Sequence, residues 1–235
     1  MSAVRSGRRN LYDAPMADRP EREIPMKAVI TIARAFGSGG ADVGRRIASR
    51  LGFYYADRSV LALAAKRLGL AEAELSSREE RVKSFWEDMM DVFALGPVDG
   101  VYTPPPLGRV SDEDIFAQES RIMKGLAERH DCVVIGRGGR YVFEGHPKAF
   151  HVLLHAPLDF RVARVMQVYG IRTRDEALRM IDEYDQARTA FRMKMTKEDP
   201  WRATNYHLCI DTGGVALERV ADIIVAGHQA KFAAR

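Results

Sequence analysis

A run of small residues stands between an apolar segment and a helical pattern, at a place where a phosphate could be bound. The apolar segment is 26–32, and apolar residues recur every four positions over 43–51. The run between them consists of Gly37, Ser38, Gly39 and Gly40. Small residues at a strand-to-helix turn let backbone N–H groups approach an anion at the positive end of the helix. We therefore expect these four residues to bind phosphate; the alternative, a tight turn without a ligand, needs fewer of them.

The loop departs from the P-loop pattern G-x-x-x-x-G-K-S/T at two positions that do chemistry. Gly39 matches the second glycine, but Gly40 stands where the lysine belongs and Ala41 where the hydroxyl belongs. In P-loop enzymes that lysine contacts the outer phosphates, and the hydroxyl helps to bind magnesium. A working site must therefore take its positive charge from elsewhere. Arg34, at the base of the loop, is the nearest candidate, and its alternative role is that of an ordinary surface arginine.

The chain that carries this loop alternates between apolar runs and helical patterns. Strands are predicted at 26–32, 53–55, 132–135, 150–155 and 206–211. Helices are predicted at 43–51, 58–68, 77–93, 111–129, 173–193 and 215–229, with a further helix starting at Pro157. Because the strands are continuously apolar and alternate with helices, they indicate one parallel sheet covered on both faces, which is an α/β fold.

Length and composition are those of one ordinary globular domain. The 235 residues are 46% hydrophobic and 29% charged, which excludes a disordered or collagen-like chain. We expect a single domain over 26–235, preceded by a disordered tail over 1–25, where arginines and prolines occur without apolar periodicity. No run approaches the roughly 20 apolar residues of a membrane helix, and the N-terminal segment lacks the apolar core of a signal peptide. These features predict a cytoplasmic protein with no membrane partner.

Charge and cysteine content narrow the classes of partner. The formal net charge of +4 comes from 36 basic and 32 acidic residues, which are interspersed. Such a balance does not require a nucleic-acid partner, and a small excess also fits a pocket lined with arginines for nucleotide phosphates. Cys132 and Cys209 each lie inside an apolar run. We therefore expect both to be buried, and we predict neither a disulfide nor a zinc site.

Four segments, taken in their order and spacing, resemble the cytidylate kinase-like family, divergent relatives of bacterial cytidylate kinase among the P-loop nucleoside monophosphate kinases. The segments are 30–40, 53–58, 134–142 and 205–212, and the resemblance extends over about 27–230. It implies a P-loop NTPase-type three-layer fold, with a parallel sheet flanked by helices. It also implies a helical insertion after Asp57 that binds a nucleoside monophosphate, and an arginine-bearing lid at about 179–201.

The segment that resembles the lid carries two arginines on one helix face. Asp185, Arg188 and Arg192 follow one another at spacings of three and four residues. Paired guanidiniums that close over a γ-phosphate are the expected means of stabilising phosphoryl transfer, because this reaction mainly needs position and positive charge. We therefore predict that Arg188 and Arg192 are catalytic. The alternative is a solvated helix face with salt bridges around Asp185.

The end of the strand at 132–135 also resembles a substrate-binding segment of cytidylate kinases. Gly136 and Arg137 match the first two members of a Gly-Arg-Asp segment that contacts the monophosphate in that family, so Arg137 is implied to orient the acceptor. Gly138 does not match the third member, and Ile135 stands where the family has an acid. Two expected carboxylates are therefore missing. Asp57 or Asp42 would have to help hold a magnesium ion.

Two further positions are implied to contact the nucleotide. Asp57 matches the aspartate of the family's tyrosine-aspartate motif, although it also suits the N-cap of the helix that begins at Arg58. Asp211 and Thr212 resemble the segment that borders the ATP base, with a plain turn before Gly213 as the alternative.

These features together predict an enzyme that uses ATP and Mg²⁺ and transfers the γ-phosphoryl group to a small acceptor. The resemblance favours a pyrimidine nucleoside monophosphate, CMP or dCMP, so the expected partners are small-molecule nucleotides. Two alternatives remain open. One is a nucleotide-binding sensor that kept the fold and lost the chemistry. The other is a kinase of a non-nucleotide acceptor bound in the pocket formed by 57–107.

Overall fold

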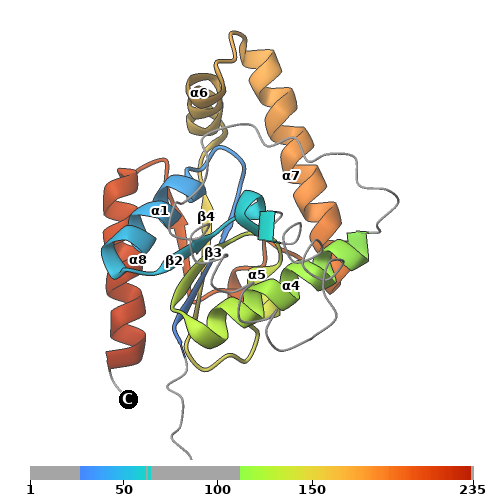
Figure 1. Cartoon of the computed structure of the whole chain (residues 1–235). Coiled ribbons are helices and arrows are strands. Elements are labelled where there is room, and N and C mark those ends of the chain that lie inside the picture. Colours follow the sequence, from blue (N-terminus) through green and yellow to red (C-terminus); the bar gives the residue numbers. More distant parts are fainter. Residues whose placement is uncertain (1–26, 62, 65–111, 234–235) are drawn as a thin grey trace, which may run out of the picture.

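The centre of the molecule is a five-stranded parallel sheet with the strand order β2-β3-β1-β4-β5 (Figure 1). The computed structural model describes residues 27–61, 63–64 and 112–233. The strands are β1 (Val29–Arg34), β2 (Tyr54–Ala56), β3 (Cys132–Ile135), β4 (Ala149–His155) and β5 (Leu208–Asp211). Because β1 lies between β3 and β4, the loop that follows β1 emerges at the middle of the carboxyl edge of the sheet.

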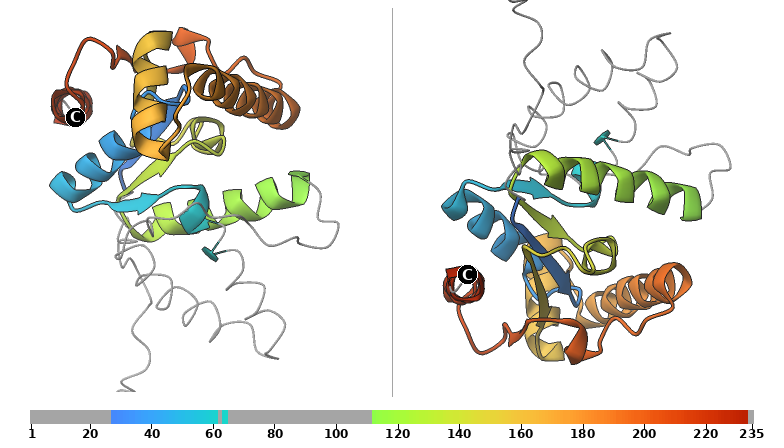
Figure 2. Two further views of the ribbon diagram at one scale, coloured as in Figure 1. Left: turned by 90° about the horizontal axis from the view of Figure 1, so that it is seen from above. Right: turned by 90° about the horizontal axis from the view of Figure 1, so that it is seen from below.

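Helices cover both faces of the sheet, which gives the three layers of the predicted α/β fold (Figure 2). The described helices are α1 (Gly40–Leu51), α4 (Asp112–Arg129), α5 (Gly139–Val142), α6 (Leu158–Tyr169), α7 (Arg174–Thr196), α8 (Leu217–Ala233) and the 3₁₀ helix η1 (Ala203–Asn205). Helices α1 and α8 pack on one face of the sheet, and α4 packs on the other. Residues 58–61 and 63–64 are also helical.

The two cores follow from the alternation of side chains along the strands. Ile30 and Ile32 of β1 pack against α1 and α8, together with Ile47 and Ile224. Val29, one position away, faces the opposite core with residues of α4. Every residue of β3 is fully buried, as expected for a parallel strand covered on both faces.

Helices α6 and α7 form a third packing unit beyond the sheet (Figure 1). Phe36, from the loop after β1, is buried in this unit. Its other buried members are Val162, Val165, Ala177 and Ile181. The loop after β1 therefore continues directly from the sheet, and the side chain of Phe36 packs it against α6 and α7.

Local sequence signals placed most of the described elements correctly. α1 ends at Leu51, and Gly52 has the left-handed backbone of a C-cap, with φ of 67°. α7 begins after Thr173, whose hydroxyl accepts the backbone N–H of Glu176, and it runs to Thr196, three residues beyond the prediction. The predicted tail at 1–25 and helix at 77–93 lie outside the described residues, as does most of the predicted insertion.

One burial prediction was wrong. Cys132 is buried in β3, but Cys209 is exposed. Cys209 lies in β5, which is an edge strand of the sheet, so its apolar neighbours do not enclose it. Both cysteines are free in the structure.

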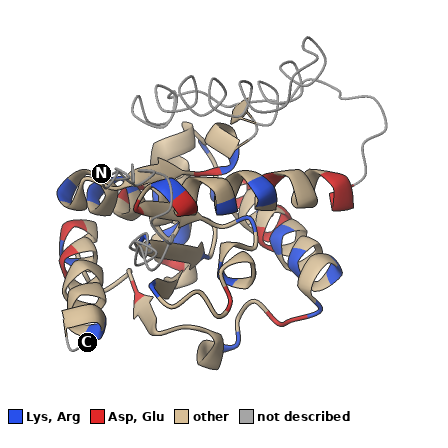
Figure 3. Ribbon diagram, turned by 60° about the horizontal axis from the view of Figure 1, so that its bottom comes forward, with Lys and Arg blue, Asp and Glu red and all other residues tan. Residues whose placement is uncertain are grey.

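The surface of the described helices carries mixed charge. Figure 3 shows acidic and basic residues interspersed along the ribbons, as the composition predicted. Salt bridges join α1 to α8 through Arg46 and Arg50, both of which pair with Glu218. Within the part of the chain that is described, no helix has both the length and the apolar character needed to span a membrane.

His151 gives the fold a predictable sensitivity to acid. Its ring is only 7% exposed, and Nδ1 lies 2.8 Å from the Thr31 hydroxyl. Burial lowers the pKa of His151 from 6.5 to about 3. Between pH 6.5 and pH 3 the unfolded chain binds a proton at this histidine that the folded chain does not bind. The contribution of His151 to the free energy of unfolding is therefore complete above pH 6.5 and decreases as the pH falls.

We expect the His151 ring to remove about 2 kcal/mol from the free energy of unfolding between pH 7 and pH 5. The Thr31→Val/His151→Leu double variant removes both members of the hydrogen bond and should lose this component of the pH dependence. Urea unfolding of both proteins at the two pH values measures the difference. Equal pH dependence in the two proteins would contradict the assignment.

Candidate active site

The loop between β1 and α1 has a backbone suited to an anion. Gly37 and Gly39 both have φ of +81°, in the left-handed region that glycine adopts without strain. Gly39 is the N-cap of α1 and provides no side chain to cap the helix. The backbone donors of the first turn of α1 are therefore left without a side-chain cap at the positive end of the helix, and phosphate binding by this loop stays a prediction.

The side chain of Arg34 passes between two glycines. A Cβ atom on Gly40 would lie 2.8 Å from Arg34 Cγ, and one on Gly136 would lie 1.8 Å from Arg34 Nη1. The stem of Arg34 therefore follows the start of α1, and its guanidinium lies at the carboxyl end of β3. The guanidinium forms no hydrogen bond or ion pair with another described residue. This placement is not that of an ordinary surface arginine.

Arg188 and Arg192 of α7 are close enough to Arg34 for their positive charges to act on it. Desolvation and the nearby positive charges of Arg188 and Arg192 lower the pKa of Arg34 to about 9, against the opposing effect of Tyr55 and Asp57. Arg34 stays protonated at neutral pH. Like charges brought together in this way favour a bound anion that would compensate them.

Arg188 retains unsatisfied hydrogen-bonding capacity. Its Nη1 atom is buried and has no hydrogen-bond partner. The same atom lies 3.7 Å from Asp185 Oδ1, and the guanidinium lies over the ring of Phe36, 5.1 Å from the ring centroid. Burial is the main cause that lowers the pKa of Arg188. An unpaired buried donor of this kind is costly unless a ligand satisfies it.

Tyr55 is a site residue that the sequence analysis missed. It is 4% exposed, and its hydroxyl is buried without a hydrogen-bond partner. Burial, and then the negative charge of Asp57, raise the pKa of the hydroxyl. A tyrosine in a short apolar strand gives no sequence signal for such a role, because most such tyrosines pack in a core.

The lid helix is fastened to the loop through Asp185. Asp185 Oδ1 accepts the backbone N–H of Phe36 at 2.8 Å, and Oδ2 accepts a hydrogen bond from Arg161. Arg161 in turn donates from Nε to the Phe36 carbonyl at 2.9 Å. The Phe36 ring stacks on Tyr184, with ring centroids 4.5 Å apart. Asp185 is only 19% exposed, so it does not lie on a solvated helix face.

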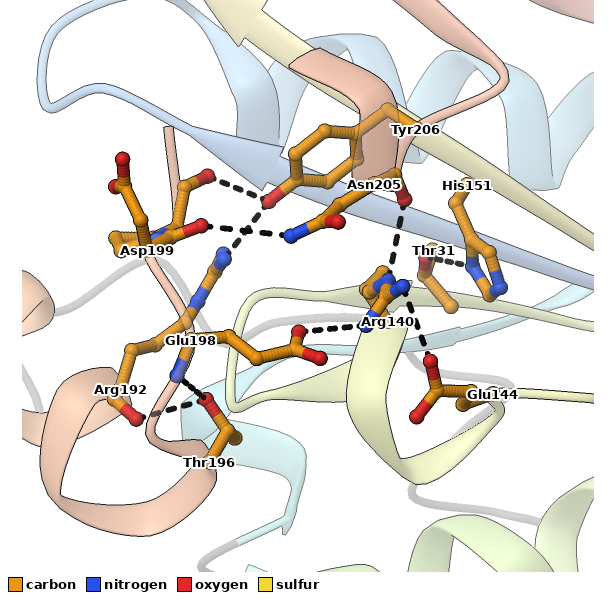
Figure 4. Close-up of polar contacts among 11 residues, drawn as sticks. Thr31, Arg140, Glu144, His151, Arg192, Thr196, Glu198, Asp199, Asn205 and Tyr206 are labelled. Atoms are coloured by element: carbon orange, nitrogen blue, oxygen red, sulfur yellow. Dashed lines mark hydrogen bonds and ion pairs between the residues drawn. The ribbon is translucent and has the colours of Figure 1, made fainter. Parts of the chain in front are cut away.

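The far end of the lid is closed by polar contacts that include Arg192 (Figure 4). Arg192 Nη1 donates to the Tyr206 hydroxyl at 2.8 Å, and that hydroxyl donates to the Pro200 carbonyl at 2.7 Å. Arg140 of α5 binds Glu198, with Nη1 and Oε2 2.6 Å apart. These bonds hold the segment after α7 against α5 and hold the guanidinium of Arg192 at Tyr206.

Arg137 is held in a defined position at the end of β3. Its φ is +50°, and its guanidinium lies over the ring of Phe191, 4.5 Å from the centroid. Arg137 Nε is 2.6 Å from Oε2 of Glu119, which is 3% exposed on α4. Burial raises the pKa of Glu119, and the positive charge of Arg137 opposes that shift. The sequence analysis missed Glu119, because an acid in an amphipathic helix usually faces solvent.

The other predicted nucleotide contacts have structural partners. Asp57 Oδ1 accepts the backbone N–H groups of Ser59 and Val60, so Asp57 is an N-cap as the alternative stated. Asp211 Oδ1 accepts the N–H of Gly213 in a turn. Thr212 is buried and donates to the Ser38 carbonyl at 2.8 Å, which ties the end of β5 to the glycine loop. Their contact with a nucleotide stays a prediction.

The described residues do not fit a magnesium ion held by the protein. Magnesium is usually bound by one or two carboxylates together with the phosphates of the substrate. Asp42, one of the two predicted ligands, is paired with both Arg45 and Arg164. At the end of β3, Ile135 is buried and the next position is filled by the guanidinium of Arg34. Among the described residues, no three histidine, cysteine or acidic side chains form a cluster able to hold a metal.

A parallel sheet of this strand order, with helices on both faces and a glycine loop after the central first strand, defines a P-loop kinase-type α/β protein. The chain belongs to the cytidylate kinase-like family, whose model matches residues 29–214. This confirms both the family and the fold class predicted from the sequence.

Solved structures are similar to this chain, and one with a TM-score of 0.65 shares its fold. An uncharacterized protein from Eubacterium ventriosum is 18% identical, with a TM-score of 0.65 over 87% of this chain and 99% of that one. A gluconokinase from Sinorhizobium meliloti 1021 is 18% identical, with a TM-score of 0.47 over 87% of this chain and 93% of that one.

A curated relative matches over part of its length. A uronate isomerase from Corynebacterium glutamicum is 31% identical over 137 residues, which is 54% of this chain and 26% of the relative. The chain thus spans about a quarter of the length of that protein.

Removing the charge of Asp185 should loosen the lid. In the Asp185→Asn variant the bonds to Phe36 and Arg161 lose their charge, and we expect the free energy of unfolding to fall by about 1–3 kcal/mol. Urea unfolding measures this change. The matched control is Arg174→Gln, which breaks the exposed pair with Asp159 and should cost less than about 0.5 kcal/mol. Equal effects in the two variants would show that Asp185 does not fasten the lid.

Proposed function

We propose that this protein transfers the γ-phosphoryl group of ATP to a small acceptor. The observation that carries the proposal is the approach of Arg188 to Arg34 beside the glycine loop, where the guanidinium of Arg188 lies over Phe36 and its buried Nη1 atom has no hydrogen-bond partner. Phosphate oxygens would satisfy this donor and compensate the like charges. Membership of a kinase-like family supports the same class of reaction.

The donor phosphates would lie between the loop and the lid. Backbone N–H groups of the loop and the first turn of α1 contact them from one side. Arg34 provides the positive charge that a P-loop lysine normally provides, and Arg188 and Arg192 approach from α7. Phosphoryl transfer depends mainly on positioning and on stabilising charge at the equatorial oxygens, so three fixed guanidiniums are suitable groups.

The acceptor would lie near the end of β3. Arg137 is fixed there by Glu119, which contacts its Nε and Nη2 atoms, and by Phe191, whose ring lies against its guanidinium. A guanidinium fixed in this way suits the phosphate of a nucleoside monophosphate. We infer a pyrimidine monophosphate, CMP or dCMP, as the acceptor. Its phosphate oxygen is already nucleophilic, so little acid–base catalysis is needed.

Two other functions remain candidates. The name of the relative from Corynebacterium glutamicum, a uronate isomerase, favours a sugar acid as an alternative acceptor, since Arg137 would bind a carboxylate as readily as a phosphate. A nucleotide sensor without catalysis is favoured by Gly40 and Ala41, which replace the lysine and hydroxyl of the P-loop pattern.

The first experiment measures ADP formation by the full chain with ATP and magnesium chloride. The acceptors are CMP, dCMP, UMP, AMP, GMP and glucuronate, with a reaction lacking acceptor as the control. We expect turnover that depends on CMP or dCMP. Turnover with glucuronate alone would overturn the nucleotide acceptor but keep the kinase. ATP binding without turnover on any acceptor would favour the sensor.

Replacing the lid arginines tests their role in catalysis. We expect Arg188→Ala and Arg192→Ala each to lower kcat by about 10²–10³-fold, as loss of a group that stabilises the transition state does. The matched control is Arg179→Ala, which removes an exposed arginine of the same helix and should leave kcat within about twofold. Unchanged kcat in both lid variants would remove these arginines from the mechanism.

A further inference from the structure

The guanidinium of Arg34 lies where the protein part of a magnesium site would be expected. In P-loop enzymes, magnesium is held by the P-loop hydroxyl and by an acid on a neighbouring strand. Here Ala41 replaces the hydroxyl, and the end of β3 offers Ile135 and Gly136 instead of an acid. A Cβ on Gly136 would lie 1.8 Å from Arg34 Nη1, so the arginine itself fills this position.

We propose that Arg34 replaces the magnesium ligands of the protein as well as its P-loop lysine, so that the site binds the nucleotide as a metal-free polyanion. The inference rests on the proposed function and specifies the form of the donor nucleotide that the site recognises. It concerns nucleotide binding: Arg34 takes the place of both the P-loop lysine and the magnesium ligands of the protein.

The path of Arg34 shows that it and its two glycines act as a unit. A side chain at position 40 would meet the stem of Arg34, with Cγ 2.8 Å and Cβ 3.0 Å from its Cβ. A P-loop lysine at Gly40 therefore cannot coexist with Arg34 in this position. A side chain at Gly136 would meet the guanidinium itself. The two glycines leave the space that Arg34 needs to carry positive charge from β1 to the end of β3.

The charges around Arg34 disfavour a divalent cation. Arg188 and Arg192 act on it with the same sign, and both would repel a metal ion. Asp57 is a carboxylate whose charge acts on Arg34, and its Oδ1 already accepts two backbone N–H groups. A nucleotide polyphosphate without bound magnesium carries more negative charge, so it should be attracted more strongly by this field.

A purely structural role explains Arg34 less well. A guanidinium that only filled space at the edge of the sheet would be expected to pair with a carboxylate, because desolvating an unpaired charge is costly. Arg137 and Arg161 show this arrangement, since Arg137 pairs with Glu119 and Arg161 pairs with Asp185. Arg34 has no such pair with a described residue, so its charge is available to a ligand.

Isothermal titration of the full chain with ATP, once in EDTA and once in excess magnesium, tests the proposal. We expect the Kd in EDTA to equal the Kd in magnesium or to be up to about tenfold lower. A Kd in EDTA at least tenfold higher than in magnesium would overturn the inference and leave the proposed kinase intact. No binding in either condition would overturn the proposed function, and the inference with it.

An Arg34→Met variant separates the charge from the packing. Methionine keeps an unbranched stem between Gly40 and Gly136 and removes the guanidinium. We expect the affinity for ATP in EDTA to fall at least 30-fold, and the affinity in magnesium to fall less. Arg219→Met on α8, where the arginine is 77% exposed, is the control and should leave both affinities unchanged. An unchanged affinity in EDTA for Arg34→Met would overturn the proposal. If Arg34→Met does not fold, the titration of the unaltered chain in EDTA and in magnesium is sufficient to test the proposal.

Discussion

The charge of Arg34, carried through a gap between two glycines, is the constraint on which the site depends. Its stem needs Gly40 to have no side chain, and its guanidinium needs the same of Gly136. Because these glycines lie on α1 and after β3, one arginine specifies residue types on two other elements that meet at the carboxyl edge of the sheet. The hydroxyl of Tyr55 and the Nη1 atom of Arg188 are also buried there without a hydrogen-bond partner. Unsatisfied donors gathered in one place are the arrangement that the proposed phosphate ligand would satisfy.

The position of the lid follows from Phe36. Its backbone N–H and carbonyl are bound by Asp185 and Arg161, and its ring is buried between α6 and α7. The glycine loop and the lid are therefore joined by the residue directly before Gly37. Any movement of α7 relative to the sheet must break the bond between Asp185 and Phe36 or move the loop with it. This coupling holds Arg188, one turn after Asp185, close to the backbone of the glycine loop.

Sequence patterns predicted the fold well because they report local and periodic features. The C-cap at Gly52, the N-cap at Thr173 and the buried strand of Cys132 all depend on neighbours in the chain. The prediction failed for Cys209, because exposure at an edge strand depends on strand order and not on the local pattern. Glu119 and Tyr55 were missed for the same reason: Glu119 meets its partner 18 residues away, and the unpaired hydroxyl of Tyr55 is visible only in three dimensions.

The altered P-loop illustrates how a motif can be lost while its electrostatics is kept. The pattern places positive charge on the helix, at the residue after the second glycine. In this chain the positive charge belongs to Arg34, six residues earlier. The Arg34 side chain runs past Gly40, so its guanidinium lies at the same edge of the sheet. A guanidinium reaches further than an ammonium group and presents several donors in a plane, so it can replace more than one lost contact. The absence of the lysine therefore does not by itself argue against catalysis, since the requirement for phosphoryl transfer is the position of the charge and not the residue that supplies it.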